Sequence, residues 1–333
     1  MITVVEPGLL TTPQDAGRVG LMHLGVGRAG AFDAPSLRLA NALAGNSHGA
    51  CALEVTLFGP TLCFQRDAWI AVTGAPLPVR IDGEEQSMWS PLPLRSGQTL
   101  ELGAMRHGCR AYLAVRGGFD LPCVLGSRSL DVNAALGPFG RPLRAGDALE
   151  MGSGSFFDIR STAHGNKRKN EPDPISRKWR LDARHWFDAE TPRALRLMPG
   201  THGSRMDAVS REAVFAHEFR VGNDSNRVGA RLGGARLQLS APSEMVSEGC
   251  VAGTLQLPPS GEPIALGVEH PVSGGYPRIG QIAAVDLPRL AQCRPGDALR
   301  FVRCMPEDAS RAFHEREQRL RKLESAILQR LRD

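Results

Sequence analysis

The sequence predicts a mainly β protein built from two related domains, with few helices. Three observations predict this class: short apolar runs separated by glycine and proline, little helical periodicity, and phrases of one half that recur in the other. A hydrophobic content of 42% and a charged content of 23% are typical of a chain that folds around apolar cores. The 333 residues are enough for two domains.

Strand-like segments run through most of the chain. DAWIAVTGAPLPVRIDG contains two apolar, β-branched runs divided by TGAP, and CRAYLAVRGGFDLP and AGTLQLPPSGEPIALGV repeat the pattern. Strands at close spacing with turn signals between them favour a sandwich or a barrel over alternating strands and helices.

Helical segments are few and short, apart from the last one. The first is expected at 34–44, with Asp33 as its N-cap and Gly45 as its C-terminal stop. Two more are expected at 206–217 and 286–293.

The C-terminal segment 306–333 is expected to form an amphipathic helix that packs on another surface. Its charged residues lie outside a single apolar stripe. The stripe consists of Phe313, Leu320, Leu323, Ile327 and Leu331.

Two β-domains are indicated by recurring phrases. LRAGDALEM at 143–151 resembles CRPGDALRFV at 293–302, and each is a turn followed by a strand. A polar, basic stretch containing proline divides the two halves. We therefore expect a first β-domain at 1–160, a linker at 161–190 and a second β-domain at 191–305.

Composition argues against several classes of partner. The net charge of +5 is mild and aromatic residues make up only 5%, which is unlike a nucleic-acid-binding face. The seven cysteines form no C-x-x-C pair, so neither a zinc site nor a disulfide framework is indicated. No apolar run reaches about 18 residues and the N-terminus lacks a basic leader. We expect a cytoplasmic protein with no membrane contact, no metal and no tightly bound cofactor.

GVGRAG at 25–30 matches the dinucleotide-binding pattern of glycines in its letters only. That pattern needs a buried strand before the first glycine and a helix that starts near the second. GRVGLMHL precedes Gly25 and is too interrupted for such a strand, and all three glycines precede the expected helix. A glycine-rich surface loop is the favoured interpretation.

Polar residues gather in four loop segments: TTPQDAGRVG, GNDSNRVGARLGG, EMVSEGC and EHPVSGGYPRIG. Arginine, aspartate and serine on such loops suit a small polar ligand, and the arginines favour an anionic one. The alternative at each segment is a capped turn. No nucleophile elbow, phosphate loop or zinc helix is present in the sequence.

Taken in order, several phrases resemble the family of 5-oxoprolinase C subunits, which is also described as biotin-dependent carboxyltransferase-like or allophanate hydrolase subunit 2-like. The phrases include PGLLTTPQDAGRVG, GVGRAGAFD, ALEVTLFGPTLCF, YLAVRGGFDLPCVLGSRS, SNRVGARL and SGGYPRIGQ, and they span almost the whole chain. The resemblance implies two cyclophilin-like β-barrel domains.

The resemblance also implies a function. In this family the C subunit works with the B and A subunits, and the complex uses ATP to open the lactam of 5-oxo-L-proline to L-glutamate. The implied substrate is therefore a small anionic lactam or amide. Fused relatives suggest a first alternative, a carboxyltransferase component that acts with carboxybiotin. A second alternative is a regulatory protein without catalytic activity.

Candidate site residues follow from the clusters and from the resemblance. Asp15 and Gln14 are the catalytic candidates, although Asp15 equally suits a turn aspartate that accepts local amide hydrogens. Arg227 is the first choice for substrate binding, because a guanidinium grips a carboxylate with two hydrogen bonds. The remaining substrate-binding candidates are Arg18, Asp33, Gly274, Gly275 and Tyr276.

The chain departs from the family pattern just before its GGYPRI phrase. Relatives carry N-D-A-Q-T-T there, whereas this chain has Glu269 in place of the aspartate and Pro271 in place of the glutamine. The identity of the substrate is therefore less firmly implied than the fold.

Overall fold

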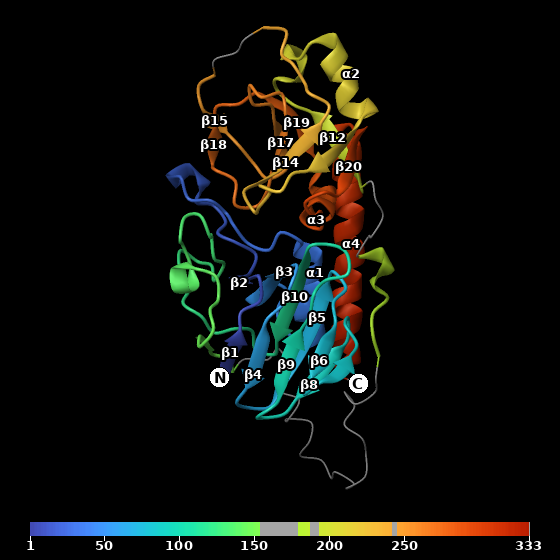
Figure 1. Ribbon diagram of the computed structural model, residues 1–333. Helices are drawn as coiled ribbons and strands as arrows, with labels where there is room; N and C mark the ends of the chain where they lie inside the picture. Colours follow the sequence, from blue (N-terminus) through green and yellow to red (C-terminus); the bar gives the residue numbers. More distant parts are fainter. Residues whose placement is uncertain (154–178, 187–192, 242–244, 333) are drawn as a thin grey trace. The chain divides into compact units, whose positions relative to one another are not determined.

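The computed structural model describes residues 1–153, 179–186, 193–241 and 245–332. The chain forms two compact units that interleave along the sequence (Figure 1). The first unit comprises Met1–Ala16, Ala34–Phe187 and Arg319–Asp333, and the second comprises Gly17–Asp33 and Asp188–Gln318. The domain boundaries expected from the sequence stay a prediction, and most of the expected linker at 161–190 lies outside the described residues.

Two antiparallel sheets make up the body of the first unit. The six-stranded sheet has the order β11 (Ala148–Leu149), β1 (Ile2–Glu6), β4 (Thr61–Phe64), β9 (Thr99–Leu102), β6 (Val79–Ile81) and β7 (Glu84–Gln86). The five-stranded sheet has the order β2 (Leu10–Gln14), β3 (Ala52–Thr56), β10 (Arg110–Val115), β5 (Ala68–Gly74) and β8 (Pro91–Leu94).

The core of the first unit draws on both sheets. Leu62 and Phe64 come from the six-stranded sheet, whereas Leu53, Val72 and Leu113 come from the five-stranded one, and all are fully buried in one cluster. Alternate residues of a strand point to opposite faces. The side chains between these apolar residues on the five-stranded sheet therefore point to its other face, where α1 (Ala34–Ala44) packs on β5 and β10.

The second unit contains a closed barrel of seven strands. Only the pairing of β12 with β20 is parallel, and the buried core includes the ring pair Phe219–Phe301 with centroids 5.6 Å apart. A separate two-stranded sheet joins β15 (Glu248–Gly249) to β18 (Ser273–Gly274). Around the barrel the order is β12 (Arg193–Pro199), β19 (Arg278–Ile282), β16 (Thr254–Gln256), β17 (Ile264–Leu266), β14 (Gly229–Gly234), β13 (Glu218–Val221) and β20 (Ala298–Arg303).

The helices lie where the sequence predicts them. The described residues contain four α-helices, of which α1 ends at Ala44 and is followed by Gly45 with a φ of +77°. The other three are α2 (Ala208–Ala216), α3 (Leu287–Ala291) and α4 (Pro306–Arg330). Short 3₁₀ turns are η1 (Met22–Leu24), η2 (Pro138–Gly140), η4 (Ala183–His185), η5 (Gly203–Arg205) and η6 (Ala284–Asp286).

Helix α4 buries its apolar stripe within the chain itself. Leu320, Ile327 and Leu331 are 0%, 2% and 4% exposed, and Phe313 and Leu323 are half-buried. The predicted class is thus confirmed: a mainly β protein with a few short helices and a C-terminal amphipathic helix. The strand pairing closes a barrel in the second unit, whereas in the first unit it forms two sheets. Among the described residues, no helix has both the length and the apolar composition to cross a membrane.

Candidate functional site

The five-stranded sheet of the first unit carries a row of buried polar residues. Thr12 lies opposite Glu54, Glu54 opposite Tyr112, and Tyr112 opposite Thr73. Residues that lie opposite one another share a face of the sheet. The Thr73 hydroxyl donates to the Ser36 carbonyl of α1 at 2.6 Å, so the row faces this helix.

Glu54 lies at the centre of this row with two partners from β10. The Tyr112 hydroxyl donates to its Oε2 atom at 2.7 Å, and Arg110 Nε lies 3.3 Å from its Oε1 atom. The side chains of Arg110 and Glu54 are 7% and 0% exposed, so this ion pair is desolvated. Sequence reasoning missed Arg110 and Tyr112. Their signal was present in RAYLAV, where two polar residues alternate with alanine and leucine at strand spacing.

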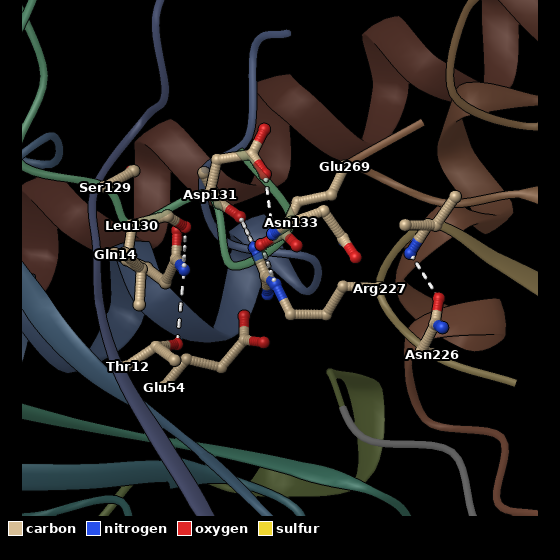
Figure 2. A network of polar contacts seen from close by, with 12 residues as sticks. Thr12, Gln14, Glu54, Ser129, Leu130, Asp131, Asn133, Asn226, Arg227 and Glu269 are labelled. Atoms are coloured by element: carbon tan, nitrogen blue, oxygen red, sulfur yellow. Dashed lines mark hydrogen bonds and ion pairs between the residues drawn. The ribbon is translucent and has the colours of Figure 1, made fainter. Parts of the chain in front are cut away.

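Gln14 is fully buried at the end of β2, two residues after Thr12. Its Nε2 atom donates to the Leu130 carbonyl at 2.9 Å and to Thr12 Oγ1 at 3.2 Å (Figure 2). Its Oε1 atom has no hydrogen-bond partner in the described part of the chain. A buried acceptor without a donor costs about 1–3 kcal/mol, so this atom marks a place where a donor is needed.

Asp15 fastens a loop to β2. The hydroxyls of Ser127 and Ser129 both donate to its Oδ1 atom at 2.6 Å, and the Arg128 amide donates to its Oδ2 atom at 2.6 Å. The Leu130 amide then donates to the Pro13 carbonyl along the edge of the strand. This geometry supports the interpretation as a turn aspartate, and the catalytic role of Asp15 stays a prediction.

In the second unit, Arg227 and Glu269 form a buried ion pair. The two residues are 4% and 5% exposed, and Arg227 Nε donates to Glu269 Oε1 at 2.5 Å. Arg227 Nη2 also donates to the Gly30 carbonyl at 2.7 Å. The arginine expected to bind a substrate carboxylate therefore binds a carboxylate of the chain itself.

The GVGRAG loop belongs to this unit and has no dinucleotide-binding geometry. The 3₁₀ turn η1 precedes Gly25, and β2 has ended long before it. The Gly30 carbonyl is held by Arg227, and Phe32 lies in the core of the second unit. Asp33 accepts from Gln292 Nε2 at 2.8 Å. The segment around Gly30 is thus attached to the second unit by side-chain hydrogen bonds and by the buried Phe32 ring.

The other substrate-binding candidates occupy different surroundings. Arg18 is only 1% exposed, and its amide donates to the Arg28 carbonyl at 2.7 Å. A Cβ atom on Gly274 would lie 2.6 Å from Gln256 Nε2, so a larger residue here would displace the end of the Gln256 side chain. A Cβ atom on Gly275 would lie 3.5 Å from the Met245 carbonyl oxygen, which is ordinary contact, and Tyr276 is 44% exposed.

Two of the sequence clusters meet at the small β15–β18 sheet. Arg278, from the SGGYPRIG phrase, donates to Glu248 and to the Gly249 carbonyl, both from the EMVSEGC phrase. His202 joins them, since its Nδ1 atom accepts from the Arg278 amide at 3.1 Å. Burial lowers the pKa of His202, which favours the neutral ring.

His270 is a second buried imidazole of this unit. Its ring Nδ1 and the Pro271 carbonyl lie 2.8 Å apart, and burial lowers its pKa. Among the residues that the structure describes, no group of three or more histidine, cysteine, aspartate or glutamate side chains suits a metal ion.

Comparison with known proteins gives the family. The family model described as carboxyltransferase domain, subdomain A and B, matches residues 24–303. The chain is 35% identical to the C subunit of 5-oxoprolinase from Escherichia coli over 290 residues, which cover 86% of each chain. It is 33% identical to the C subunit of 5-oxoprolinase from Haemophilus influenzae over 292 residues, again with 86% coverage of both.

A solved structure agrees with these relatives. The urea carboxylase of Kluyveromyces lactis superposes with a TM-score of 0.83 and 28% identity, over 96% of this chain and 29% of that chain. The match at full domain length confirms the resemblance that the ordered phrases suggested. The chain belongs to the carboxyltransferase-domain family, among the relatives of the 5-oxoprolinase C subunit.

Proposed function

We propose that the chain is the C subunit of an ATP-dependent 5-oxoprolinase and that it acts in a cytoplasmic complex with the A and B subunits. One observation carries the proposal: the alignments with two proteins of that name each cover 86% of this chain and 86% of the relative. The urea amidolyase of Saccharomyces cerevisiae is equally similar at 35% identity, but the aligned part is only 12% of that protein. The chain thus matches most of the length of a C subunit, whereas it matches a small part of the larger enzyme.

The proposed reaction opens 5-oxo-L-proline to L-glutamate. An unstrained lactam resists attack by water because its nitrogen donates electron density to the carbonyl. Phosphorylation of the carbonyl oxygen by ATP would weaken that conjugation, which is why ATP is a reasonable co-substrate. We assign no ATP contact to the GVGRAG loop, because η1 and not a strand leads into it.

The site residues remain proposals. Buried polar groups of the first unit, around Gln14 and Glu54, offer desolvated hydrogen bonds to a small substrate. The proposed set is Asp15 and Gln14 for catalysis and Arg18, Asp33, Arg227, Gly274, Gly275 and Tyr276 for substrate binding.

Coexpression with the A and B subunits tests the proposal. The purified complex is expected to release glutamate from 5-oxo-L-proline when ATP is present. Turnover no higher than that of the isolated A subunit would contradict the assignment.

A carboxyltransferase component is the second candidate, and the similarity to the K. lactis urea carboxylase favours it. This candidate requires a biotinylated carrier as partner. A pull-down from the native host that recovers a streptavidin-reactive protein would support it, whereas an eluate without one supports the 5-oxoprolinase proposal.

A further inference from the structure

The segment 19–27 of the second unit, which we call the apolar tip, presents apolar side chains to solvent (dark blue in Figure 1). Val19 and Leu24 are 73% and 66% exposed. The apolar residues of the segment that are half-buried are Leu21, Met22 and Val26. The segment contains no Asp, Glu, Lys or Arg. Single exposed apolar residues are ordinary, whereas a group of them marks an interaction surface.

The apolar tip is held in one conformation by the second unit. The Arg18 amide donates to the Arg28 carbonyl at 2.7 Å, which closes the loop at its base. On either side of the tip, Arg18 and Ala29 are 1% and 3% exposed. Within it, the Leu24 and Gly25 amides close the turn η1 with backbone hydrogen bonds of 2.9 and 3.0 Å. Because the tip is already ordered, binding it costs little conformational entropy.

The chemistry of the apolar tip favours a protein partner. Loops and helices that bind membrane surfaces combine apolar residues with lysine or arginine, and the tip has neither. Two tips from two copies of this chain would make an interface far smaller than the roughly 20–30 residues a side of a stable complex. A tip that entered a different surface of a copy would build an open chain of molecules unless the ring closed. An apolar, uncharged pocket on another protein fits the tip best.

The relatives hold this domain together with other polypeptide. The aligned region makes up 29% of the K. lactis urea carboxylase chain. The E. coli and H. influenzae relatives are, by name, subunits of 5-oxoprolinase. In the complex that we propose for this chain, the neighbouring polypeptide is a separate subunit, and the main body of the chain is expected to bind the B subunit.

We propose that the apolar tip inserts into an apolar, uncharged pocket of the B subunit and anchors the interface between the two chains. This inference rests on the proposed function and names the surface through which the chain joins its complex. A few central apolar residues carry most of the energy of such an interface, and weaker contacts around them exclude water.

The test measures the Kd of the full-length chain for the purified B subunit by titration calorimetry. Val19→Ser removes apolar contact area and should weaken binding about 10-fold. Leu24→Asp places a carboxylate in the apolar pocket and should weaken binding at least about 100-fold. Leu24→Met keeps an apolar side chain of similar volume and should retain most of the affinity. The substituted side chains are exposed, so all three variants should melt close to the wild type.

Val209→Ser is the matched control. Val209 is 79% exposed on α2 of the same unit, so the variant makes the same chemical change on an equally exposed valine outside the tip. It should leave the Kd unchanged. The heat capacity change of association gives a second measurement, because burial of apolar surface makes it negative. Val19→Ser should make this change less negative, and Val209→Ser should not alter it.

The outcomes separate this inference from the proposed function. A wild-type chain that binds neither the A nor the B subunit contradicts the proposed function. Tip variants that bind the B subunit as tightly as the wild type overturn the role of the tip and leave the proposed function standing. The role is equally overturned if Leu24→Asp instead abolishes binding to the A subunit, self-association in sedimentation, or binding to phosphatidylcholine–phosphatidylglycerol vesicles.

Discussion

Replacement of Arg227 by methionine should destabilise the second unit by about 3–5 kcal/mol, because it leaves a carboxylate buried without its cation. Glu269 is only 5% exposed, and Arg227 supplies the hydrogen bond at 2.5 Å that offsets its desolvation. Arg227 also donates a hydrogen bond to the Gly30 carbonyl at 2.7 Å, so the backbone around Gly30 should become more mobile in the variant.

The double variant Arg227→Met, Glu269→Leu isolates the pair. Removing both charges also removes the cost of burying them, so the double variant should recover most of the stability that the single variant loses. The coupling between the two sites is then expected to reach about 2 kcal/mol or more, within the range for residues in contact. Arg231→Met is the control, since its partner Asp224 lies 3.9 Å away and both side chains are exposed, at 58% and 80%.

Amide hydrogen exchange resolved over β14 and β17 measures the opening free energy of the second unit directly. The control is expected to change it by less than about 1 kcal/mol. If Arg227→Met changes the opening free energy no more than the control, the ion pair does not stabilise this unit. Arg227 would then be held for another purpose, such as a substrate carboxylate.

Three further predictions concern packing, pH and the C-terminal helix. Gly274→Ala should cost about 1–3 kcal/mol because the buried end of the Gln256 side chain would have to move away from the new Cβ atom. Gly275→Ala, whose Cβ would meet its neighbours only at van der Waals distance, should have a much smaller effect on thermal unfolding; equal losses would contradict the packing argument. His202 has a pKa lowered by burial, so the unfolded chain takes up its proton first and stability should fall as pH drops below about 6.5. His202→Asn keeps an acceptor for the Arg278 amide and should make the unfolding free energy depend less steeply on pH, and His270 should account for the dependence that remains. An unchanged pH dependence would show that His202 does not cause it. Deletion of residues 307–333 should lower the melting temperature, because three stripe residues of α4 are buried within the chain, and it should spare binding to the B subunit; the reverse result would make α4 the docking element.

Much of the fold was predictable from local signals. The helix at 34–44 is followed by a glycine that adopts a left-handed conformation, and α2 is preceded by the N-cap Asp207, whose side chain accepts from the Ser210 amide. Such caps depend on neighbours in sequence. The closure of seven strands into a barrel depends on pairings between distant strands, including the parallel pair β12–β20, and no local pattern specifies them.

The site was less predictable for the same reason. Gln14, Asp15 and Arg227 stood out as polar residues in loops or at strand ends. Asp15 is bound by the 127–131 loop and Arg227 by Glu269, both distant in sequence. The sequence therefore did not reveal that these two side chains already have partners within the chain. The Gln14 Oε1 atom has no hydrogen-bond donor among the described residues, and this becomes visible only in the folded structure.

The most direct test of the central proposal is an omission series with this chain and the purified A and B subunits. Glutamate formed and ATP hydrolysed are measured together, with each component left out in turn. We expect ATP-dependent glutamate release that falls to the background of the A subunit when this chain is omitted. A rate that is unchanged without this chain would contradict its assignment as the C subunit.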